Sequence, residues 1–235
     1  MPSFAYEKSM GTSLVAGIDE VGCGPWAGPV VAAAVIILYD FPKNILCVLR
    51  DSKKLSAPRR RAIFSQLCHE NGRTVHIGVG EISAATIDAI TIAGATKQAM
   101  KEAIDDLSVP PSALIIDGNR DPLLPFPTQM IVKGDQISYS IAAASIVAKV
   151  VRDTIMAHLD TLYSGYGWLT NVGYGTQAHL NALIRQGITP FHRQSYAPIQ
   201  KICARDGSCI PSHSKTFYDG IYNKSISKIN KIICT

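Results

Sequence analysis

The sequence predicts an α/β protein in which helices pack around a mixed sheet. Three observations predict it. Short apolar segments of strand length alternate with longer segments of helical length, glycine or proline separates many of them, and 47% of the 235 residues are hydrophobic. A core of that size supports one large domain, alone or with an appendage. We expect a β-meander, then a helix, then βα crossings.

Three strands are expected in the first third of the chain, after a loose lead-in over residues 1–12. Residues 14–20 and 30–38 form the first two, joined by a glycine-rich turn. The second is an almost unbroken run of Val, Ala and Ile, which is typical of a strand covered on both faces. Residues 74–80 alternate apolar with small or polar side chains and form the third.

Two helices accompany these strands. The first is expected from its N-cap Ser56 to about residue 70. The second covers residues 84–107, with Gly94 as the place for a break, since glycine inside a helix costs about 1 kcal/mol relative to alanine. Asp105 and Asp106 near its end are interpreted as solvated.

The rest of the chain supplies two more strands and the later helices. The strands are expected at residues 113–116 and 129–132. A long alanine-rich helix over 137–163 carries small residues that permit close packing on the sheet. Thr176 is expected to cap a shorter helix that ends before Gly187. Beyond residue 201 the apolar pattern thins into a polar tail.

Carboxylates stand at the ends of three of these strands. Asp19 and Glu20 end the first, and two carboxylates about 4 Å apart repel by roughly 4 kcal/mol at an effective dielectric constant of 20. Asp117 ends the fourth strand, and Asp135 follows the fifth. If the first and fourth strands are neighbours, Asp19, Glu20 and Asp117 come within reach of one divalent cation, and Asp135 approaches from the next strand end.

An all-carboxylate cluster indicates Mg²⁺ or Mn²⁺ rather than zinc, and such clusters act on phosphoryl groups. The residues alone therefore predict a metal-dependent phosphoryl-transfer enzyme, with a nuclease as the leading example. Two alternatives stay open at this point. Each acid can instead accept hydrogen bonds from turn amides, or from a helix N-terminus in the case of Asp135. A nucleic-acid-binding module with such acids would bind no Mg²⁺.

The glycine-rich turn does not match the motifs of nucleotide-binding folds. Gly22, Gly24 and Gly28 resemble a phosphate cradle, but a strand rather than a helix is expected to follow them. Pro25 also lacks the backbone N–H that a cradle needs. No Gly-Lys-Ser/Thr sequence is present for a P-loop.

Composition limits the compartment and the partner. No apolar run reaches the roughly 20 residues of a membrane helix, and the first residues do not form a secretory signal. Six scattered cysteines without a CxxC pair favour a reducing cytoplasm. The net charge of +5, with basic residues clustered at 50–61 and 201–231, favours an acidic partner such as nucleic acid, although a solvated charged face is the simpler alternative.

Long motifs in this sequence resemble those of bacterial ribonuclease HII, the type 2 ribonuclease H. They are GIDEVGCGPWAGPVVAAAV, DSKKLS, the strand end Ile116-Asp117-Gly118, KGDQISYSIAAASIVAKVVRD, GYGTQAHL and ITPFHRQSYAP, in the family's order over roughly residues 13–200. The resemblance implies a ribonuclease H-like fold with a central mixed five-stranded sheet flanked by helices and an extra C-terminal helical segment. It also implies one catalytic domain over residues 13–202, with a basic tail over 203–235.

The implied activity is endonucleolytic. The family hydrolyses the RNA strand of RNA–DNA hybrids and incises 5′ to a single ribonucleotide embedded in duplex DNA, leaving 3′-hydroxyl and 5′-phosphate ends. By the resemblance, Asp19, Glu20, Asp117 and Asp135 are the catalytic acids, and they hold Mn²⁺ or Mg²⁺ in a two-metal hydrolysis. The 2′-hydroxyl of the ribonucleotide would help to complete the metal site, so that DNA linkages are spared.

The resemblance also implies residues that bind the substrate. Gly22, Cys23 and Gly24 occupy the family's Gly-Arg-Gly loop, whose backbone reads the ribose 2′-hydroxyl, the group that distinguishes the substrate from DNA. Tyr174 matches the tyrosine that stacks on the sugar after the ribonucleotide. Phosphate contacts are expected from lysines of two motifs, namely Lys53, Lys54 and Lys149.

Two positions depart from the family pattern. Cys23 replaces the usual arginine of the loop, and Val172 stands where a lysine is common. Both changes remove positive charge, so they bear on substrate affinity more than on chemistry. The related ribonuclease HIII carries an additional N-terminal domain, whereas only about a dozen residues precede the first expected strand here. A monomer is expected by default.

Overall fold

The computed structural model describes residues 2–49, 52 and 55–206. The chain forms two compact units. The sheet unit comprises residues 1–21, 31–81 and 96–150, and the loop unit comprises residues 22–30, 82–95 and 151–235. The names refer to the five-stranded sheet of the first unit and to the glycine-rich loop of the second.

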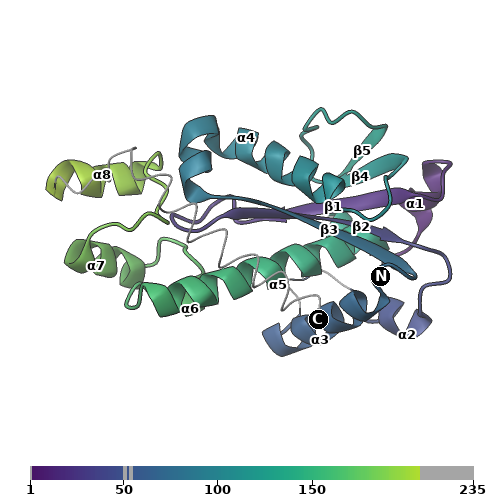
Figure 1. The fold of residues 1–235 in the computed structure, drawn as a ribbon, viewed down its shortest axis with the longest axis horizontal. Helices are drawn as coiled ribbons and strands as arrows, with labels where there is room; N and C mark the ends of the chain where they lie inside the picture. The colour runs from purple at the N-terminus through teal and green to yellow at the C-terminus, as the bar shows by residue number, and fades with distance from the viewer. Residues whose placement is uncertain (1, 50–51, 53–54, 207–235) are drawn as a thin grey trace. The chain divides into compact units, whose positions relative to one another are not determined.

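A mixed five-stranded sheet organises the sheet unit (Figure 1). The strand order is β3-β2-β1-β4-β5, with β1 antiparallel to β2 and parallel to β4, and β4 parallel to β5. All five predicted strands are confirmed, with ends shifted by one or two residues. Their bounds are Val15–Val21 for β1, Val30–Ile37 for β2, Val75–Ile82 for β3, Ala113–Asp117 for β4 and Thr128–Ile131 for β5.

Helices of the sheet unit cover both faces of this sheet (Figure 1). The second half of α4 lies on one face, and the first half of α5 lies with α3 on the other. Two short helices, α1 and α2, and the 3-10 turn η2 complete the unit. The bounds are Ala5–Ser9 for α1, Lys43–Leu46 for α2, Ala57–Glu70 for α3, Ala84–Asp105 for α4, Gly134–Gln136 for η2 and Tyr139–Leu162 for α5.

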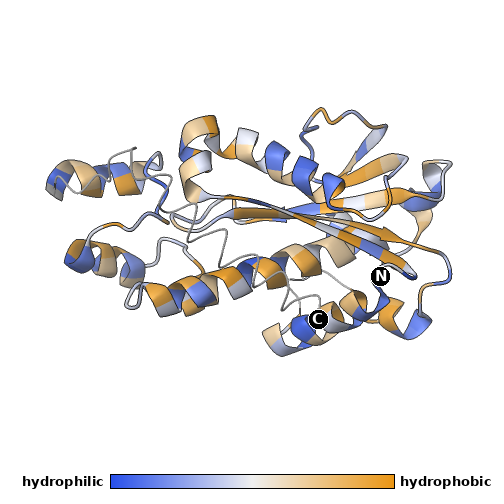
Figure 2. Ribbon diagram, viewed as in Figure 1, coloured by the Kyte–Doolittle hydropathy of each residue, from blue (hydrophilic) through white to orange (hydrophobic). Residues whose placement is uncertain are grey.

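The core of the sheet unit lies along β1, β2 and β4. Every residue of β2 is buried, as its apolar sequence predicts, and the hydrophobic colouring of these strands is visible in Figure 2. Gly17 of β1 allows α5 to pack directly on the sheet. A Cβ atom at Gly17 would lie 2.3 Å from the backbone carbon of Ser140, so only glycine fits. The contact sets the start of α5 against β1, two positions before Asp19.

The expected loose lead-in at residues 1–12 is wrong, because this segment contains helix α1. Glu7 of α1 is 5% exposed, and its carboxylate accepts hydrogen bonds from the Ser138 hydroxyl (2.8 Å) and the Ser140 backbone N–H (3.1 Å). The first N–H groups of a helix have no partner within the helix, and a carboxylate is favourable at this end. Glu7 therefore anchors the N-terminal segment to the start of α5.

Helix α4 breaks at Thr91 rather than at the predicted Gly94. Thr91 has φ 67° and ψ 162°, outside the helical region, and its hydroxyl accepts the backbone N–H of Gly94 at 3.4 Å. This hydroxyl caps the second part of the helix. Asp106, interpreted as simply solvated, accepts the backbone N–H of Val79 in β3 at 2.9 Å.

The described part of the loop unit contains the first half of α4, the second half of α5, and the helices α6, α7 and α8. Thr176 caps α7 as predicted, since its hydroxyl accepts the backbone N–H of His179 at 3.2 Å. The last helix of the described residues, α8, continues to Asp206, and residues 207–235 of the predicted tail lie outside the described residues. The domain boundary at residue 202 stays a prediction. The bounds are Trp168–Asn171 for α6, Gln177–Gln186 for α7 and Ala197–Asp206 for α8.

Hydropathy along the described helices bears on the membrane prediction. None of them combines the length with the apolar character that crossing a bilayer requires.

Candidate active site

The sheet brings carboxylates together at the carboxyl ends of three neighbouring strands. Ile18 of β1 is paired with Ile116 of β4 in parallel register, so Asp19 and Asp117 follow at equivalent positions of adjacent strands. Glu20 is next to Asp19, and Asp135 lies in η2, directly after β5. The predicted neighbourhood of the first and fourth strands is thereby confirmed.

Burial and like charge act together on Asp19. The residue is 8% exposed, and its pKa is raised well above the ordinary value of 3.8 by burial first, then by the charges of Glu20 and Asp117. Two hydrogen bonds oppose part of this rise in the pKa of Asp19. One comes from the Ser145 side chain, and the other from the backbone N–H of Glu20, 2.8 Å from Asp19 Oδ1. A divalent cation would compensate such a cluster of negative charge, and all of its donors are oxygens, as Mg²⁺ and Mn²⁺ prefer.

A hydrogen bond connects two of the acid-bearing segments. Asp117 Oδ1 accepts the backbone N–H of Gly134 at 2.7 Å, which ties the end of β4 to the turn that carries Asp135. Asp135 itself is 3% exposed. The turn is held from its other side, because the backbone N–H groups of Ile137 and Ser138 donate to the carbonyl of Gly134.

The four acids are not gathered into a ready ligand shell. In the part of the chain that the structure describes, no three His, Cys, Asp or Glu side chains are arranged to hold one ion. Asp19, Glu20, Asp117 and Asp135 as ligands of one metal site stay a prediction.

Sequence reasoning missed three polar residues behind Asp19. The hydroxyls of Ser145 in α5 and Ser52 in the DSKKLS motif lie 2.7 Å apart and are buried. Arg60 of α3 donates to the carbonyl oxygens of Ser52 (2.6 Å) and Leu55 (2.9 Å). Arg60 was counted within a basic cluster whose simpler interpretation is a solvated face, but this side chain is 9% exposed. Ser52 and Ser145 lie in the motifs DSKKLS and KGDQISYSIAAASIVAKVVRD, which were the available signal, whereas Arg60 lies outside them.

The three predicted phosphate-binding lysines have different outcomes. Lys149 is a partly exposed residue of α5. Lys53 and Lys54 lie outside the described residues. The role of all three stays a prediction.

In the loop unit, two buried arginines form hydrogen bonds to the glycine-rich loop, residues 22–29. Arg152 and Arg193 are each 0% exposed, and both donate to backbone carbonyl oxygens of the loop. Gly22 has φ +97°, and a Cβ atom there would lie 2.3 Å from Arg152 Nε. Glycine is therefore required at position 22 by its conformation and by the arginine packed against it.

Tyr174 lies beside this loop. A Cβ atom at Gly24 would meet the Tyr174 ring at 3.4 Å, and the tyrosine is 49% exposed. The backbone N–H groups of Trp26 and Ala27 donate to the carbonyl of Gly173, which fixes the two segments together. The predicted recognition residues Gly22, Cys23, Gly24 and Tyr174 are thus brought together, and Cys23 is partly buried.

Solved structures show the fold. The ribonuclease H2 of Pyrococcus horikoshii is similar with a TM-score of 0.69 and 24% identity, over 81% of this chain and 97% of that chain. A ribonuclease HIII described in complex with Mn²⁺ gives a TM-score of 0.64 at 22% identity, covering 82% of this chain and 70% of that one. These likenesses show the fold, which is that of the ribonuclease H hydrolases.

Sequence relatives then fix the family. The model of the ribonuclease HII family matches residues 16–199. Ribonuclease HII of Rhodospirillum rubrum is 50% identical over 214 residues, 91% of this chain and 96% of the relative. Ribonuclease HII of Enterococcus faecalis is 51% identical, over 83% of this chain and 73% of the relative. The chain belongs to the ribonuclease HII family. It is a divalent-metal-dependent nuclease with ribonuclease H activity on RNA–DNA hybrids, so a purely nucleic-acid-binding module is excluded.

Proposed function

We propose that this enzyme incises duplex DNA 5′ to a single embedded ribonucleotide, in addition to cleaving the RNA strand of hybrids, and leaves 3′-hydroxyl and 5′-phosphate ends. One observation carries the proposal. Asp19 and Asp117 follow a parallel register pair at the ends of β1 and β4, and the pKa of Asp19 is raised by burial first, then by the charges of Glu20 and Asp117. Such coupled carboxylates at one sheet edge suit a phosphodiester hydrolase that works with divalent cations.

Four acids of the sheet unit would hold the metal. Asp19 and Asp117 would contact the central ion or ions, and Glu20 and Asp135 would complete the set. A bound Mn²⁺ or Mg²⁺ supplies positive charge for the phosphate oxygens and lowers the pKa of an attacking water. The hydrogen bond between Asp117 and Gly134 supports this assignment, because it restrains two of the acid-bearing segments together.

Recognition of the ribonucleotide is assigned to the loop unit. Gly22, Cys23 and Gly24 would read the 2′-hydroxyl through the backbone, and Tyr174 would stack on the neighbouring sugar. The lysines of both motifs, Lys53, Lys54 and Lys149, would contact phosphates. The half-exposed ring of Tyr174 beside Gly24 supports this role, since a stacking side chain must be accessible.

The substrate experiment is direct. Three labelled duplexes are offered with Mn²⁺ or with Mg²⁺: an RNA–DNA hybrid, a DNA duplex with one ribonucleotide, and the same duplex made only of DNA. We expect cleavage of the first two, with the cut in the second mapped by gel to the 5′ side of the ribonucleotide. A cut on its 3′ side, or cleavage of the hybrid alone, would refute the proposal. The ratio of the cleavage rates measured with Mn²⁺ and with Mg²⁺ also gives the metal preference.

The compartment and the oligomeric state complete the proposal. We assign the enzyme to the cytoplasm as a monomer that acts on nucleic acid without a membrane. In the described part of the chain Cys23, Cys47, Cys68 and Cys203 form no disulfide, which suits a reducing compartment. The neighbour from Archaeoglobus fulgidus was solved in complex with PCNA, and an assembly of that kind is a second partner to test.

A further inference from the structure

Arg193 is bonded to both ends of the glycine-rich loop. Its guanidinium donates to the carbonyl oxygens of Gly22 and Cys23 (3.0 Å to the latter) at the start of the loop. It also donates to Gly28 (2.9 and 3.0 Å) and Pro29 (3.1 Å) at the end of the loop. The Arg193 side chain therefore links the two ends of the loop by hydrogen bonds, although it lies 171 positions from Gly22 in the sequence.

Arg152 supports the same loop from a second direction. It donates to the carbonyl oxygens of Ala27 (3.2 Å) and Pro29 (2.9 Å), and to that of Val172 (2.9 Å), two residues before Tyr174. Burial lowers the pKa of Arg152 to about 10, and the charge of Arg193 adds to this effect. Arg152 therefore remains charged at neutral pH. A buried cation is tolerated when its donors are satisfied, and here backbone carbonyls satisfy them.

Tyr196 completes the set of loop contacts. Its hydroxyl donates to the carbonyl of Cys23 at 2.6 Å and accepts from Arg193 Nη1 at 2.9 Å. The Cys23 carbonyl thus receives two hydrogen bonds, one from each side chain. Every amino acid provides this carbonyl, so the contacts do not depend on which side chain stands at position 23.

We propose that Arg193 and Tyr196 are positioning residues for recognition of the ribose 2′-hydroxyl. They fix the carbonyls of Gly22 and Cys23 and thereby hold the reading loop in one conformation beside Tyr174. The proposal rests on the proposed function, because it concerns the loop assigned to that hydroxyl. It also explains why cysteine can replace arginine at position 23, since the fixed group is the backbone carbonyl.

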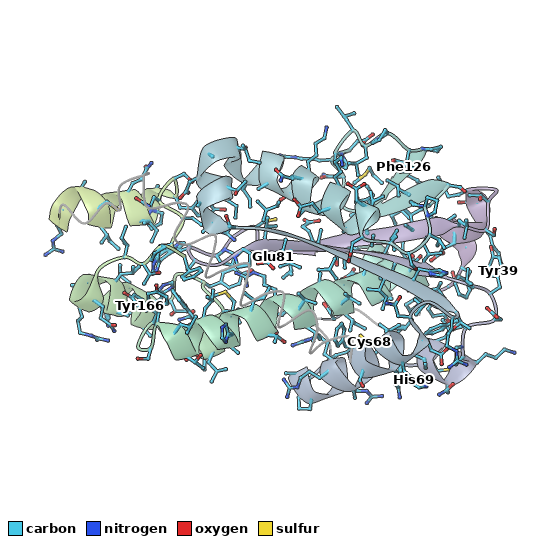
Figure 3. The ribbon with its side chains drawn as sticks, viewed as in Figure 1. Tyr39, Cys68, His69, Glu81, Phe126 and Tyr166 are labelled. Carbon is cyan, nitrogen blue, oxygen red and sulfur yellow. The ribbon has the colours of Figure 1, made fainter. Side chains whose placement is uncertain are left out.

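Tyr196→Phe tests the proposal with little disturbance of folding, and Tyr166→Phe is the matched control. The Tyr166 hydroxyl donates a hydrogen bond to the carbonyl of Gly187 at 2.9 Å, and its ring stacks on Trp168 in the same unit. Tyr166→Phe therefore removes the same kind of hydrogen bond as Tyr196→Phe, but away from the glycine-rich loop. Figure 3 labels Tyr166 among the side chains of this unit. Each change is also made in the Asp19→Asn background, so that dissociation constants are measured without cleavage.

The readout is discrimination, defined as the dissociation constant for the all-DNA duplex divided by that for the duplex with one ribonucleotide. We expect Tyr196→Phe to lower this ratio about fivefold, as for loss of one hydrogen bond. In the cleaving enzyme it should raise KM more than it lowers kcat. Tyr166→Phe should leave both unchanged. Arg193→Lys, which loses the forked contacts, should lower the ratio further if it folds.

The outcomes separate this inference from the proposed function. If the parent protein prefers the ribonucleotide duplex and Tyr196→Phe keeps the full ratio, the positioning role is refuted and the proposed function stands. If Tyr166→Phe lowers the ratio as much, the effect is general destabilisation and the positioning role is refuted as well. If the parent protein has no preference, the proposed function fails, and this inference fails with it.

Discussion

The hydroxyl oxygens of Ser52 and Ser145 lie 2.7 Å apart, although 93 positions separate the two residues in the chain. Ser145 also donates a hydrogen bond to Asp19, and Arg60 holds the backbone carbonyl of Ser52. A series of polar contacts therefore leads from α3 through the DSKKLS motif to the buried carboxylate of β1. The contact with Ser145 lowers the pKa of Asp19 and so favours the ionised form that binds a metal.

Ser145→Ala should weaken metal binding. The change removes the hydrogen bond that favours ionised Asp19, so a proton competes better with the cation. A hydrogen bond to a charged group contributes about 1.5–3 kcal/mol, so we expect Mn²⁺ affinity near neutral pH to fall by roughly 10- to 150-fold. Metal titration by calorimetry measures it.

Ser140→Ala is the control for that experiment, because Ser140 also lies in α5 but its hydroxyl donates to Glu7. It should leave Mn²⁺ affinity unchanged. An unaltered dissociation constant in Ser145→Ala would contradict the role of its hydroxyl.

Asp19→Asn should abolish cleavage and stabilise the metal-free protein. The pKa of Asp19 is raised in the folded state, so the folded protein holds this proton more tightly than the unfolded chain does. The resulting stability is present below about pH 4 and is lost as pH rises through the raised pKa. Asparagine does not ionise and escapes this loss. We therefore expect the Tm of metal-free Asp19→Asn to exceed that of the parent protein at neutral pH.

The measurement for Asp19→Asn is a series of thermal melts in chelator from pH 4 to 8, beside a gel assay with Mn²⁺. The Tm difference between the variant and the parent should grow with pH. Retained turnover would remove Asp19 from the proposed metal site, and a pH-independent difference would show that its charge does not destabilise the fold.

Cys23→Arg should leave the chemistry intact and tighten substrate binding. The carbonyl at position 23 keeps its bonds to Arg193 and Tyr196, and the new side chain adds one positive charge near the substrate phosphates. Each added phosphate contact steepens the dependence of log affinity on log salt by about 0.9. KM measured at two salt concentrations tests this, with Cys23→Ser as the uncharged control. A substantial loss of kcat in Cys23→Arg would contradict the prediction.

The buried pair His179 and His192 should make the protein sensitive to acid. Their Nε2 atoms lie 3.0 Å apart, and the Trp168 indole N–H donates to His179 Nε2 at 3.3 Å, so the pair is neutral. Burial, and then the repulsion that a protonated His179 would exert, lowers the pKa of His192 to about 3. The unfolded chain takes up this proton near pH 6.5, so stability is present above that pH and is lost as pH falls toward 3.

For His192 alone the loss between pH 7 and pH 5 is about 2 kcal/mol. Urea unfolding at the two pH values measures it. His192→Asn should be less stable at pH 7 but should show a smaller pH dependence. The exposed His69 provides the control, since His69→Asn should keep the pH dependence of the parent protein. An equal pH dependence in His192→Asn would refute the assignment.

The strands, the Thr176 cap and the acids at the strand ends could be predicted because each depends on neighbours within a few positions. The alternation of residues 74–80, the apolar run of β2 and the placement of Asp19 and Asp117 are local patterns that burial requires. The family motifs added roles for these residues. The lead-in at residues 1–12 was mispredicted for the opposite reason, because Glu7 has its partners, Ser138 and Ser140, at the start of α5, 131 and 133 positions away.

The sequence by itself therefore determined the order of strands and helices, the strand-end carboxylates and the glycine loop. Only the tertiary structure decided which charged residues are buried. Nothing in the local sequence distinguishes the buried arginines Arg60, Arg152 and Arg193 from solvated ones. The backbone carbonyls to which they donate come near them only when distant segments pack together. A hydrogen bond between residues 171 positions apart produces no periodic pattern in the local sequence, so it can be recognised only in the folded structure.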